Sequence, residues 1–435
     1  MLDINIIRNS IDIVKKDLEK RRDQEKVKWL DDLIKKDRQV LEIKKQIDDL
    51  RHERNITSES INKLKKQGKD AGTEIKKAKE IPVRLKELEE KYALLQEKIR
   101  YYMMRIPNIL HESVPCGKDD TENKEIRKWG KIPKFSFELK PHGELLEKMG
   151  LADFQRAAKI SGTGFYFLKK ELALMDLALQ RFAIDFLMQK RFILIEPPLM
   201  MNKEAYEGVT SLDDFENVMY KIDKEDLYMI ATSEHPMVAM HKDELFEEKD
   251  LPLKYVGFSP CFRKEIGSHG VDTRGIFRVH QFNKIEQVVF CKPEDSWKLH
   301  EELQKNSELM LQKLNIPYHI VSICTGDIGI VAAKKYDIEA YFPREQKYRE
   351  VTSCSNCTSY QAVRLNIKYR KDNDKLYVHT LNNTGIATAR VLRAIIENYQ
   401  REDGTINVPT VLQKYMNGIK KIGEQNDTRR IRKKD

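Results

Sequence analysis

Apolar residues recur every three or four positions between residues 28 and 104, and charged residues fill most positions between them. This spacing places the apolar side chains along one stripe of a helix, as in a coiled coil. The pattern stops at 68–72, where two glycines favour a turn, and then resumes. It therefore predicts a long antiparallel helical hairpin, with about 35–40 residues and roughly 50–60 Å per helix. The first series is Leu33, Val40, Ile43, Ile47, Leu50, Ile61 and Leu64, crossing polar Arg54 and Thr57; the second is Ala78, Ile81, Leu85, Leu88, Tyr92, Leu95, Ile99 and Tyr102.

Pro107 ends the helical pattern, and the segment 111–139 is rich in loop-forming residues, so we expect a linker there. From residue 140 to 425, apolar helical stretches alternate with short β-rich runs, which is typical of an α+β domain around a mostly antiparallel sheet. The expected organisation is an N-terminal domain over 1–110 with its arm at about 28–104, the linker, the α+β domain and a basic tail over 426–435. The expected strands include Phe192–Ile195, Tyr255–Phe258, Gln287–Phe290, Tyr318–Ile323 and Leu376–His379.

Composition narrows the class of protein. The 435 residues carry 79 basic and 69 acidic side chains, a net charge of +10, and residues 1–110 contribute 28 − 21 = +7 of it. This excess is compatible with a polyanionic partner but does not establish one. No run of 18 apolar residues and no signal-peptide pattern occurs, and six cysteines in so long a chain do not form a disulfide framework. We therefore expect a cytoplasmic protein without a membrane partner.

Lysines gather near the predicted tip of the arm. An elongated basic helical arm suits the recognition of an RNA backbone by shape and charge. A dimerising or spacing coiled coil with a solvated face also explains the same residues, since charged helical faces are usually just solvated, and the residues themselves leave both interpretations open. The candidate RNA-binding residues are Lys63, Lys65, Lys66, Lys69, Lys76 and Lys77.

The segment 258–286 carries the most informative chemistry. Arg263 and Glu265 are two residues apart, so on a strand they would share a face, and a loop with several glycines follows them. Arg278, Phe282 and Glu286 are spaced by four, so on a second strand they would also share a face. Arginines can clamp phosphates by bidentate hydrogen bonds, and an aromatic ring can stack on a flat base. The same residue types also suit a plain surface hairpin of mixed charge.

The whole string Phe262-Arg263-x-Glu265, a glycine-rich loop, then Arg278-Val279-His280-Gln281-Phe282-x-Lys284-x-Glu286 resembles motif 2 of class II aminoacyl-tRNA synthetases, in the version found in seryl-tRNA synthetases. The resemblance implies that Arg263 holds the ATP α-phosphate and also contacts serine. It further implies that Glu265 contacts the adenine amino group, Arg278 holds the γ-phosphate, and Phe282 stacks under adenine. Glu286 would bind the serine α-amino group, and Val279 would belong to the ATP site. In this family Arg263 and Arg278 serve as the catalytic residues.

Three more segments fit the same family. Thr232-Ser233-Glu234 resembles its serine-binding loop, although this tripeptide alone would suit a capped helix start. Residues 350–355 resemble the strand that contacts ATP and Mg²⁺, with Glu350 and Ser353 on the metal. Residues 381–390 resemble motif 3. In motif 3 the resemblance places Asn382 and Thr384 near the serine side chain and Arg390 over adenine. In the segment 350–355 it also places Val351 and Thr352 at ATP.

The resemblance covers nearly the whole chain and is strongest to archaeal members. It implies a homodimer whose substrates are L-serine, ATP and tRNA-Ser, and it leaves open whether tRNA-Sec is also charged. The dimer motif is looser, because Arg191 stands where glycine is expected and Gly164 stands where relatives often carry arginine.

Cys354 and Cys357 invite a zinc interpretation, but a structural zinc site needs four ligands and only one CxxC occurs. The Thr232-x-Glu234 pattern resembles that of the zinc-independent branch, so we expect no zinc. Two other functions remain open: a paralogue that has lost catalysis or changed its substrate, and a coiled-coil scaffold with an unrelated C-terminal domain. The scaffold leaves the string at 258–286 unexplained.

Overall fold

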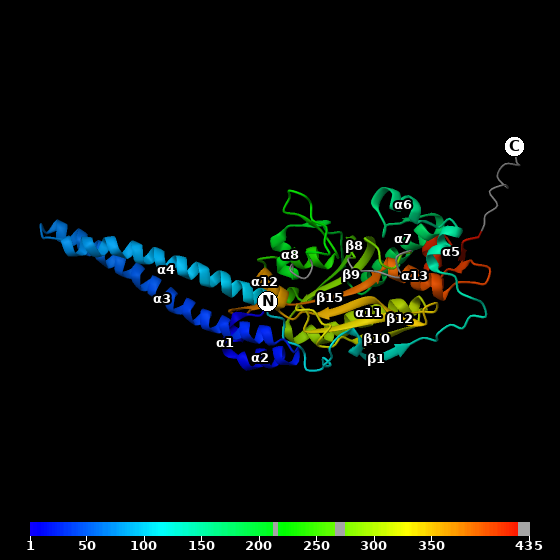
Figure 1. The fold of residues 1–435 in the computed structure, drawn as a ribbon, viewed down its shortest axis with the longest axis horizontal. Helices are drawn as coiled ribbons and strands as arrows, with labels where there is room; N and C mark the ends of the chain where they lie inside the picture. The colour runs from blue at the N-terminus through cyan, green and yellow to red at the C-terminus, as the bar shows by residue number, and fades with distance from the viewer. Residues whose placement is uncertain (212–215, 266–274, 425–435) are drawn as a thin grey trace. The chain divides into compact units, whose positions relative to one another are not determined.

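The computed structural model describes residues 1–211, 216–265 and 275–424. The chain forms two compact units, Met1–Ile109 and the part from Leu110 onward, both shown in Figure 1. The expected basic tail at 426–435, together with Gly267 and Gly270 of the glycine-rich loop, lies outside the described residues.

The first unit contains the long helical hairpin predicted from the apolar spacing (Figure 1). Asp23 begins the first long helix as an N-cap, because its carboxylate accepts a hydrogen bond from the backbone N–H of Lys26. The helix ends before Gly68, whose φ of +68° turns the chain back. The helices of this unit are α1 (Ile4–Asn9), α2 (Ile11–Lys20), α3 (Gln24–Lys66) and α4 (Gly72–Arg105).

The expected stripe of apolar residues forms the contact between α3 and α4. Ile43, Ile47 and Leu50 of α3 pack against Ile81 and Leu85 of α4 in one buried cluster. The polar residue Thr57 also lies in the buried stripe, at 6% exposure. Across the hairpin, Arg51 Nη2 lies 2.9 Å from Glu89 Oε1, which shows where the two helices are side by side.

The second unit is built on an eight-stranded sheet with the order β1-β10-β11-β12-β15-β9-β8-β4. Every neighbouring pair is antiparallel except β4 and β8, so the expected α+β domain with a mostly antiparallel sheet is confirmed. The strands are β1 (Lys124–Trp129), β4 (Ile193–Ile195), β8 (Leu253–Phe262), β9 (Gln281–Cys291), β10 (Tyr318–Ser322), β11 (Lys334–Phe342), β12 (Lys347–Asn356) and β15 (His379–Ala387).

Side chains alternate between two environments along the central strands, as strand geometry requires. On β9, Ile285 and Val289 enter the main core, whereas Lys284 and Glu286 lie on the other face of the sheet. The main core also contains the apolar sides of three helices, α7 (Lys170–Met188), α11 (Ser296–Lys313) and α13 (Thr388–Asn398). One face of the sheet is thus covered by helices, and polar side chains of the central strands are left on the opposite face.

A second core surrounds a three-stranded sheet of order β14-β13-β7. The remaining strands form two-stranded pairs. Separately, no helix among the described residues is both long and apolar enough to cross a membrane. These smaller elements are α5 (His142–Lys148), α6 (Phe154–Ser161), α8 (Lys203–Val209), α10 (Glu234–Ala239), α12 (Tyr360–Leu365), α14 (Thr410–Gln413), β2 (Ala152–Asp153), β3 (Phe167–Leu168), β5 (Met200–Met201), β6 (Tyr228–Met229), β7 (Leu245–Glu247), β13 (Lys368–Lys371), β14 (Asp374–Tyr377), β16 (Ile406–Asn407) and β17 (Lys421–Ile422).

The structure corrects two expectations about the elements. The segment 111–139 is more than a loop, because β1 lies within it and forms the edge strand beside β10. The expected strand Leu376–His379 is in fact divided: β14 ends at Tyr377, and the much longer β15 begins at His379.

Candidate active site

The polar face of the central sheet forms one wall of a cavity of about 500 Å³, a size typical of small-ligand sites. Strands β8, β9, β12 and β15 bring together segments that are more than a hundred residues apart in the sequence. Most of the site residues expected from sequence line this one cavity: Thr232, Glu234, Arg263, Glu265, Phe282, Glu286, Glu350, Val351, Thr352, Ser353, Asn382, Thr384 and Arg390.

Two carboxylates meet two neutral donors at the inner part of the cavity. Glu234, at the start of α10, accepts a hydrogen bond from Asn382 Nδ2 at 3.0 Å on its Oε1 atom. Thr384 Oγ1 donates to Glu286 Oε2 at 3.2 Å, because Thr384 and Glu286 are paired directly across strands β15 and β9. The paired strands therefore fix two acidic groups and two polar groups in one space.

Burial and mutual repulsion strongly affect these two acids. Burial raises the pKa of Glu234, and the nearby charge of Glu286 raises it further, to about 7. Burial also raises the pKa of Glu286, although Lys284 Nζ lies 2.7 Å from its Oε2 atom and opposes that rise. A compact cation bound between the two carboxylates would lower the pKa of both and favour their ionised forms, so the pair suits a cationic ligand.

The close packing behind these acids depends on a glycine. Gly257 of β8 is paired with Glu286 of β9. A Cβ atom at Gly257 would lie 2.4 Å from Met237 Cε and 2.8 Å from Ser233 Oγ. Ser233 is therefore fully buried behind the cavity and does not line it, unlike its neighbours Thr232 and Glu234.

A second group of side chains suits a phosphorylated, aromatic ligand. Arg263 Nε donates to the carbonyl oxygen of Ala231 at 3.3 Å, and its guanidinium lies 5.4 Å from the Phe282 ring centre. Arg390 Nη1 lies 3.0 Å from Glu350 Oε2 and also donates to the Glu350 carbonyl at 3.1 Å. Burial alone would raise the pKa of Glu350, but Arg390 and Lys335 outweigh it and lower the pKa to about 2. Glu350 therefore stays ionised across the neutral range.

The expected strand positions on either side of the glycine-rich loop are wrong in detail. Arg263 and Glu265 follow the end of β8 instead of lying on it, and Glu265 has a φ of +44°, yet both still line the cavity. Arg278 precedes β9, so it does not share a strand face with Phe282 and Glu286. It is exposed and Val279 is buried, and neither lines the cavity.

Other polar residues in the cavity were missed by the sequence analysis. Lys284 could have been found, because it lies midway between Phe282 and Glu286 and so shares their face of β9. Gln361 of α12 donates to Glu234 Oε1 at 3.3 Å, and Lys335 of β11 lines the cavity. These last two reach the site only through the tertiary fold, for which the sequence gives no local signal.

The two cysteines of the CxxC segment have different surroundings. Cys354 belongs to the main apolar core and its thiol donates weakly to the carbonyl oxygen of His300. Cys357 lines the cavity and accepts a weak hydrogen bond from Asn382. Burial raises the pKa of both thiols well above its ordinary value, so both are neutral side chains.

The lysines proposed for tRNA lie at the turn of the helical hairpin. All six are exposed, three of them in the last turn of α3. The others are Lys69 in the turn and Lys76 and Lys77 near the start of α4, within the blue and cyan arm of Figure 1.

Comparison with known proteins assigns this geometry to a class. Residues 218–399 match the tRNA synthetase class II core domain (G, H, P, S and T), so the sheet and its cavity are those of a class II aminoacyl-tRNA synthetase. Residues 1–110 match the seryl-tRNA synthetase N-terminal domain. The chain belongs to the seryl-tRNA synthetase family.

Individual relatives agree over almost the full chain. The serine–tRNA ligase of Methanocella arvoryzae is 58% identical over 422 residues, covering 96% of this chain and 99% of the relative. The serine–tRNA ligase of Pyrococcus horikoshii is 51% identical over 444 residues, covering 97% of each chain. The family expected from the motifs is therefore confirmed.

Solved structures agree as well. The seryl-tRNA synthetase of Pyrococcus horikoshii complexed with ATP superimposes with a TM-score of 0.91 at 50% identity, covering 97% of this chain and 99% of that one. The cytoplasmic serine–tRNA ligase of Naegleria fowleri in complex with AMP gives a TM-score of 0.87 at 35% identity, covering 97% and 98%.

Proposed function

We propose that the cavity is where this chain, a serine–tRNA ligase by family, activates L-serine with ATP. The serine carboxylate attacks the α-phosphorus of ATP in line, which forms seryl-adenylate and releases pyrophosphate. A hydroxyl of the 3′-terminal adenosine of tRNA-Ser then attacks the adenylate carbonyl and releases AMP. The observation that supports this best is the presence of the acids Glu234 and Glu286 and the phosphate-binding Arg263 in one cavity.

The proposed roles follow from charge and position. Glu286 and Glu234 bind the serine ammonium group, and Asn382 and Thr384 present hydrogen-bonding groups to its hydroxyl. A site built to bond a hydroxyl leaves buried partners unpaired when that hydroxyl is missing, so it discriminates against alanine. Arg263 neutralises charge on the α-phosphate as the pentavalent transition state forms.

We assign the adenine site to Phe282, Arg390 and Glu265, and Mg²⁺ with the ATP phosphates to Glu350 and Ser353. The oxygen donors fit such a hard cation, because Glu350 stays ionised and Ser353 lines the same cavity. When bound, Mg²⁺ supplies neutralisation of the phosphate charge. Arg278, whose side chain is exposed beside the loop, is proposed to reach the γ-phosphate when ATP binds.

Replacing Arg263 tests this assignment. We expect Arg263→Ala to reduce serine-dependent ATP–pyrophosphate exchange by about 10²–10³-fold or more, because a positioned charge at the transition state is lost. Arg370→Ala removes an exposed arginine on β13, outside the cavity, and serves as the matched control. Near-normal exchange by Arg263→Ala would refute the proposed site.

The lysines at the turn between α3 and α4 are proposed to bind tRNA-Ser through its phosphates. They are exposed and lie at the end of an arm whose apolar seam is already filled by its own two helices. Long-range binding of a polyanion needs such unburied positive charge. Because seryl-tRNA is consumed in translation, we also propose a cytoplasmic location.

A homodimer is proposed from an apolar edge on the second unit. Strand β4 ends the eight-stranded sheet, and Ile193 and Leu194 on it are 54% and 44% exposed. Leu199 and Met200, a few residues further along the chain, are 36% and 41% exposed. An exposed apolar edge strand of this kind suits association with a second copy of the chain.

A further inference from the structure

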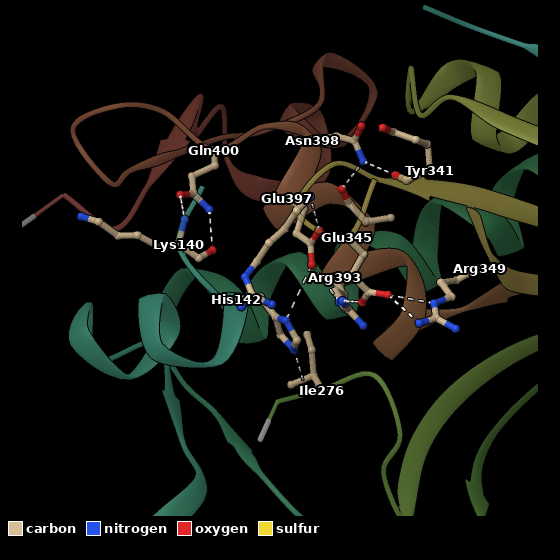
Figure 2. Close-up of polar contacts among 12 residues, drawn as sticks. Lys140, His142, Ile276, Tyr341, Glu345, Arg349, Arg393, Glu397, Asn398 and Gln400 are labelled. Atoms are coloured by element: carbon tan, nitrogen blue, oxygen red, sulfur yellow. Dashed lines mark hydrogen bonds and ion pairs between the residues drawn. The ribbon is translucent and has the colours of Figure 1, made fainter. Parts of the chain in front are cut away.

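His142, at the start of α5, lies against the segment by which the chain returns from the glycine-rich loop to β9 (Figure 2). The backbone N–H of Ile276 donates a hydrogen bond to His142 Nε2 at 3.2 Å. On the other side of the ring, Nδ1 lies 3.8 Å from Glu397 Oε1 of α13. His142 therefore bridges two segments that both carry residues of the proposed ATP site.

The hydrogen bond fixes the protonation state of this histidine. A nitrogen that accepts from a backbone N–H must carry a lone pair, so the ring is neutral and its hydrogen is on Nδ1, facing Glu397. Burial, together with Arg393 and Arg344, lowers the pKa of His142 to about 3, which agrees with this geometry. The ring is a neutral acceptor throughout the neutral pH range.

The return segment fits closely around the ring. Gly275 has a φ of +149°, which L side chains rarely adopt, and a Cβ atom there would lie 2.0 Å from His142 Nε2. The ring thus takes the space that a side chain at residue 275 would need. The side chain of Ile276 is fully buried in the main core, so the residue that donates the hydrogen bond is also held by apolar packing.

From there the contacts continue to the helix that carries Arg390. Phe277 lies 4.7 Å from the Arg393 guanidinium and 5.7 Å from that of Arg390, measured to the ring centre. Arg393, only 1% exposed, pairs with Glu397 at 2.9 Å and with Glu345, as Figure 2 shows. His142, Glu397 and Arg393 thus form one buried network beneath the return segment.

We propose that His142 is a positioning residue for ATP. By accepting from Ile276 and facing Glu397, it holds the return segment, and with it Arg278 two residues later, in register with Arg390 on α13. It touches no substrate. The inference rests on the proposed ATP site. Its effect should fall on ATP because Glu234 lies on α10, and Glu286, ten residues after Ile276, is held by the pairing of β9 with β8 and β15.

The test compares two neutral amides of different length in the full-length protein. In His142→Gln the longer amide can reach Ile276 N–H with its oxygen and face Glu397 with its nitrogen. In His142→Asn the amide is too short for both. We expect His142→Asn to raise the KM for ATP in pyrophosphate exchange by about tenfold with little change in the KM for serine, and His142→Gln to restore most of the loss.

In His142→Phe the phenyl ring fills the space of the imidazole but cannot accept the hydrogen bond from Ile276. This variant therefore distinguishes loss of the hydrogen bond from loss of packing. If the ring only filled space, Phe would retain the wild-type KM for ATP, and that result would overturn the proposal. An equal rise in both KM values in His142→Asn would overturn it as well. His300→Asn alters another buried histidine, on α11, and should leave the ratio of the two KM values unchanged. Absence of exchange in the wild-type protein would instead refute the proposed function.

Discussion

At the scale of single residues, the serine end of the cavity depends on two acids that repel each other. Glu234 and Glu286 share a buried space with Lys284 and Arg263, yet the pKa of both acids is raised, so these two cations do not fully offset the cost of burying the two carboxylates. An incoming ammonium group supplies the missing positive charge. Under the proposed function, the ammonium group of serine offsets the repulsion between the acids, so serine binding should depend on pH.

The first prediction concerns pH. Burial and the charge of Glu286 raise the pKa of Glu234 to about 7, and a bound ammonium group would favour its ionised form, so serine binding should release a proton below that pH. We expect the affinity for serine to fall as the pH is lowered from about 8 to about 6, by up to about tenfold per pH unit below the pKa. Calorimetric titration with L-serine measures this slope.

Glu234→Gln keeps the acceptor for Asn382 and removes the titration, so its weaker serine binding should vary little over the same range. Because the pKa of Glu234 is raised on folding, the wild-type protein loses stability as the pH rises from 4.5 to about 7, and the variant does not. The melting temperature of Glu234→Gln relative to the wild-type protein should thus rise from pH 4.5 to about 7 and stay constant above it. Glu204→Gln, at an exposed acid paired with Lys242, should retain the wild-type slope. An unchanged slope in Glu234→Gln would assign the titration to another group.

Residue-level prediction from sequence worked where the backbone is regular. Phe282 and Glu286 share a face of β9 because side chains alternate along a strand, and the same rule places Lys284 between them. The rule failed for Arg278, which precedes the strand. Ser233, which was expected from the resemblance alone, is buried behind Gly257. Side chains on irregular backbone depend on tertiary contacts that no periodicity encodes.

At the scale of elements, the long helices were predictable and the edge of the sheet was not. The apolar stripe of α3 and α4 is buried by their own contact, so its period appears directly in the sequence. β1 is exposed along nearly its whole length, and it therefore lacks the alternation that identifies a half-buried strand. β12 also lacks a clear alternation of apolar and polar residues, for a different reason. Thr352 and the ionised Glu350 lie on this strand and line the cavity.

Shortly after the end of α7, Arg191 has a backbone conformation that is expected to lower the free energy of unfolding. Arg191 follows the helix with a φ of +66°, in the left-handed region where glycine is favoured. We expect Arg191→Gly to raise stability by about 1 kcal/mol relative to Arg191→Ala, because alanine removes the same side chain but keeps the strained Cβ atom. Calorimetric melting of both variants measures the difference. Equal melting temperatures would show that the backbone there is not strained.

At the scale of the whole molecule, the edge strand β4 predicts association. The double variant Ile193→Glu and Leu194→Glu places charge on an apolar edge, so we expect the dimer to dissociate into monomers in light scattering at micromolar concentration. Ile160→Glu changes an apolar residue of α6 that is 70% exposed, and it should leave the mass unchanged. A wild-type protein that is already monomeric would contradict the proposed dimer.

The two compact units hold different proposed sites. The proposed activation site lies entirely in the second unit, whereas the proposed tRNA-binding lysines lie in the first. Removing residues 52–88 and joining Arg51 to Glu89 by a short glycine-serine turn cuts the arm where these two side chains are 2.9 Å apart, so α1 and α2 keep their partners. We expect serine-dependent pyrophosphate exchange to persist and charging of tRNA-Ser to fall by orders of magnitude.

Reversing charge at the turn distinguishes RNA binding from a purely structural arm. The variant replaces four lysines with glutamate and leaves the apolar seam intact, since all four side chains are exposed: Lys65, Lys66, Lys76 and Lys77. Each lost phosphate contact should reduce the salt dependence of tRNA binding, so the slope of log affinity against log salt should become shallower by about 1 per contact. Fluorescence anisotropy with tRNA-Ser at several salt concentrations measures this slope. If both the slope and charging match those of the wild-type protein, the arm is a spacing or dimerising coiled coil, because its charges then contribute nothing to tRNA binding.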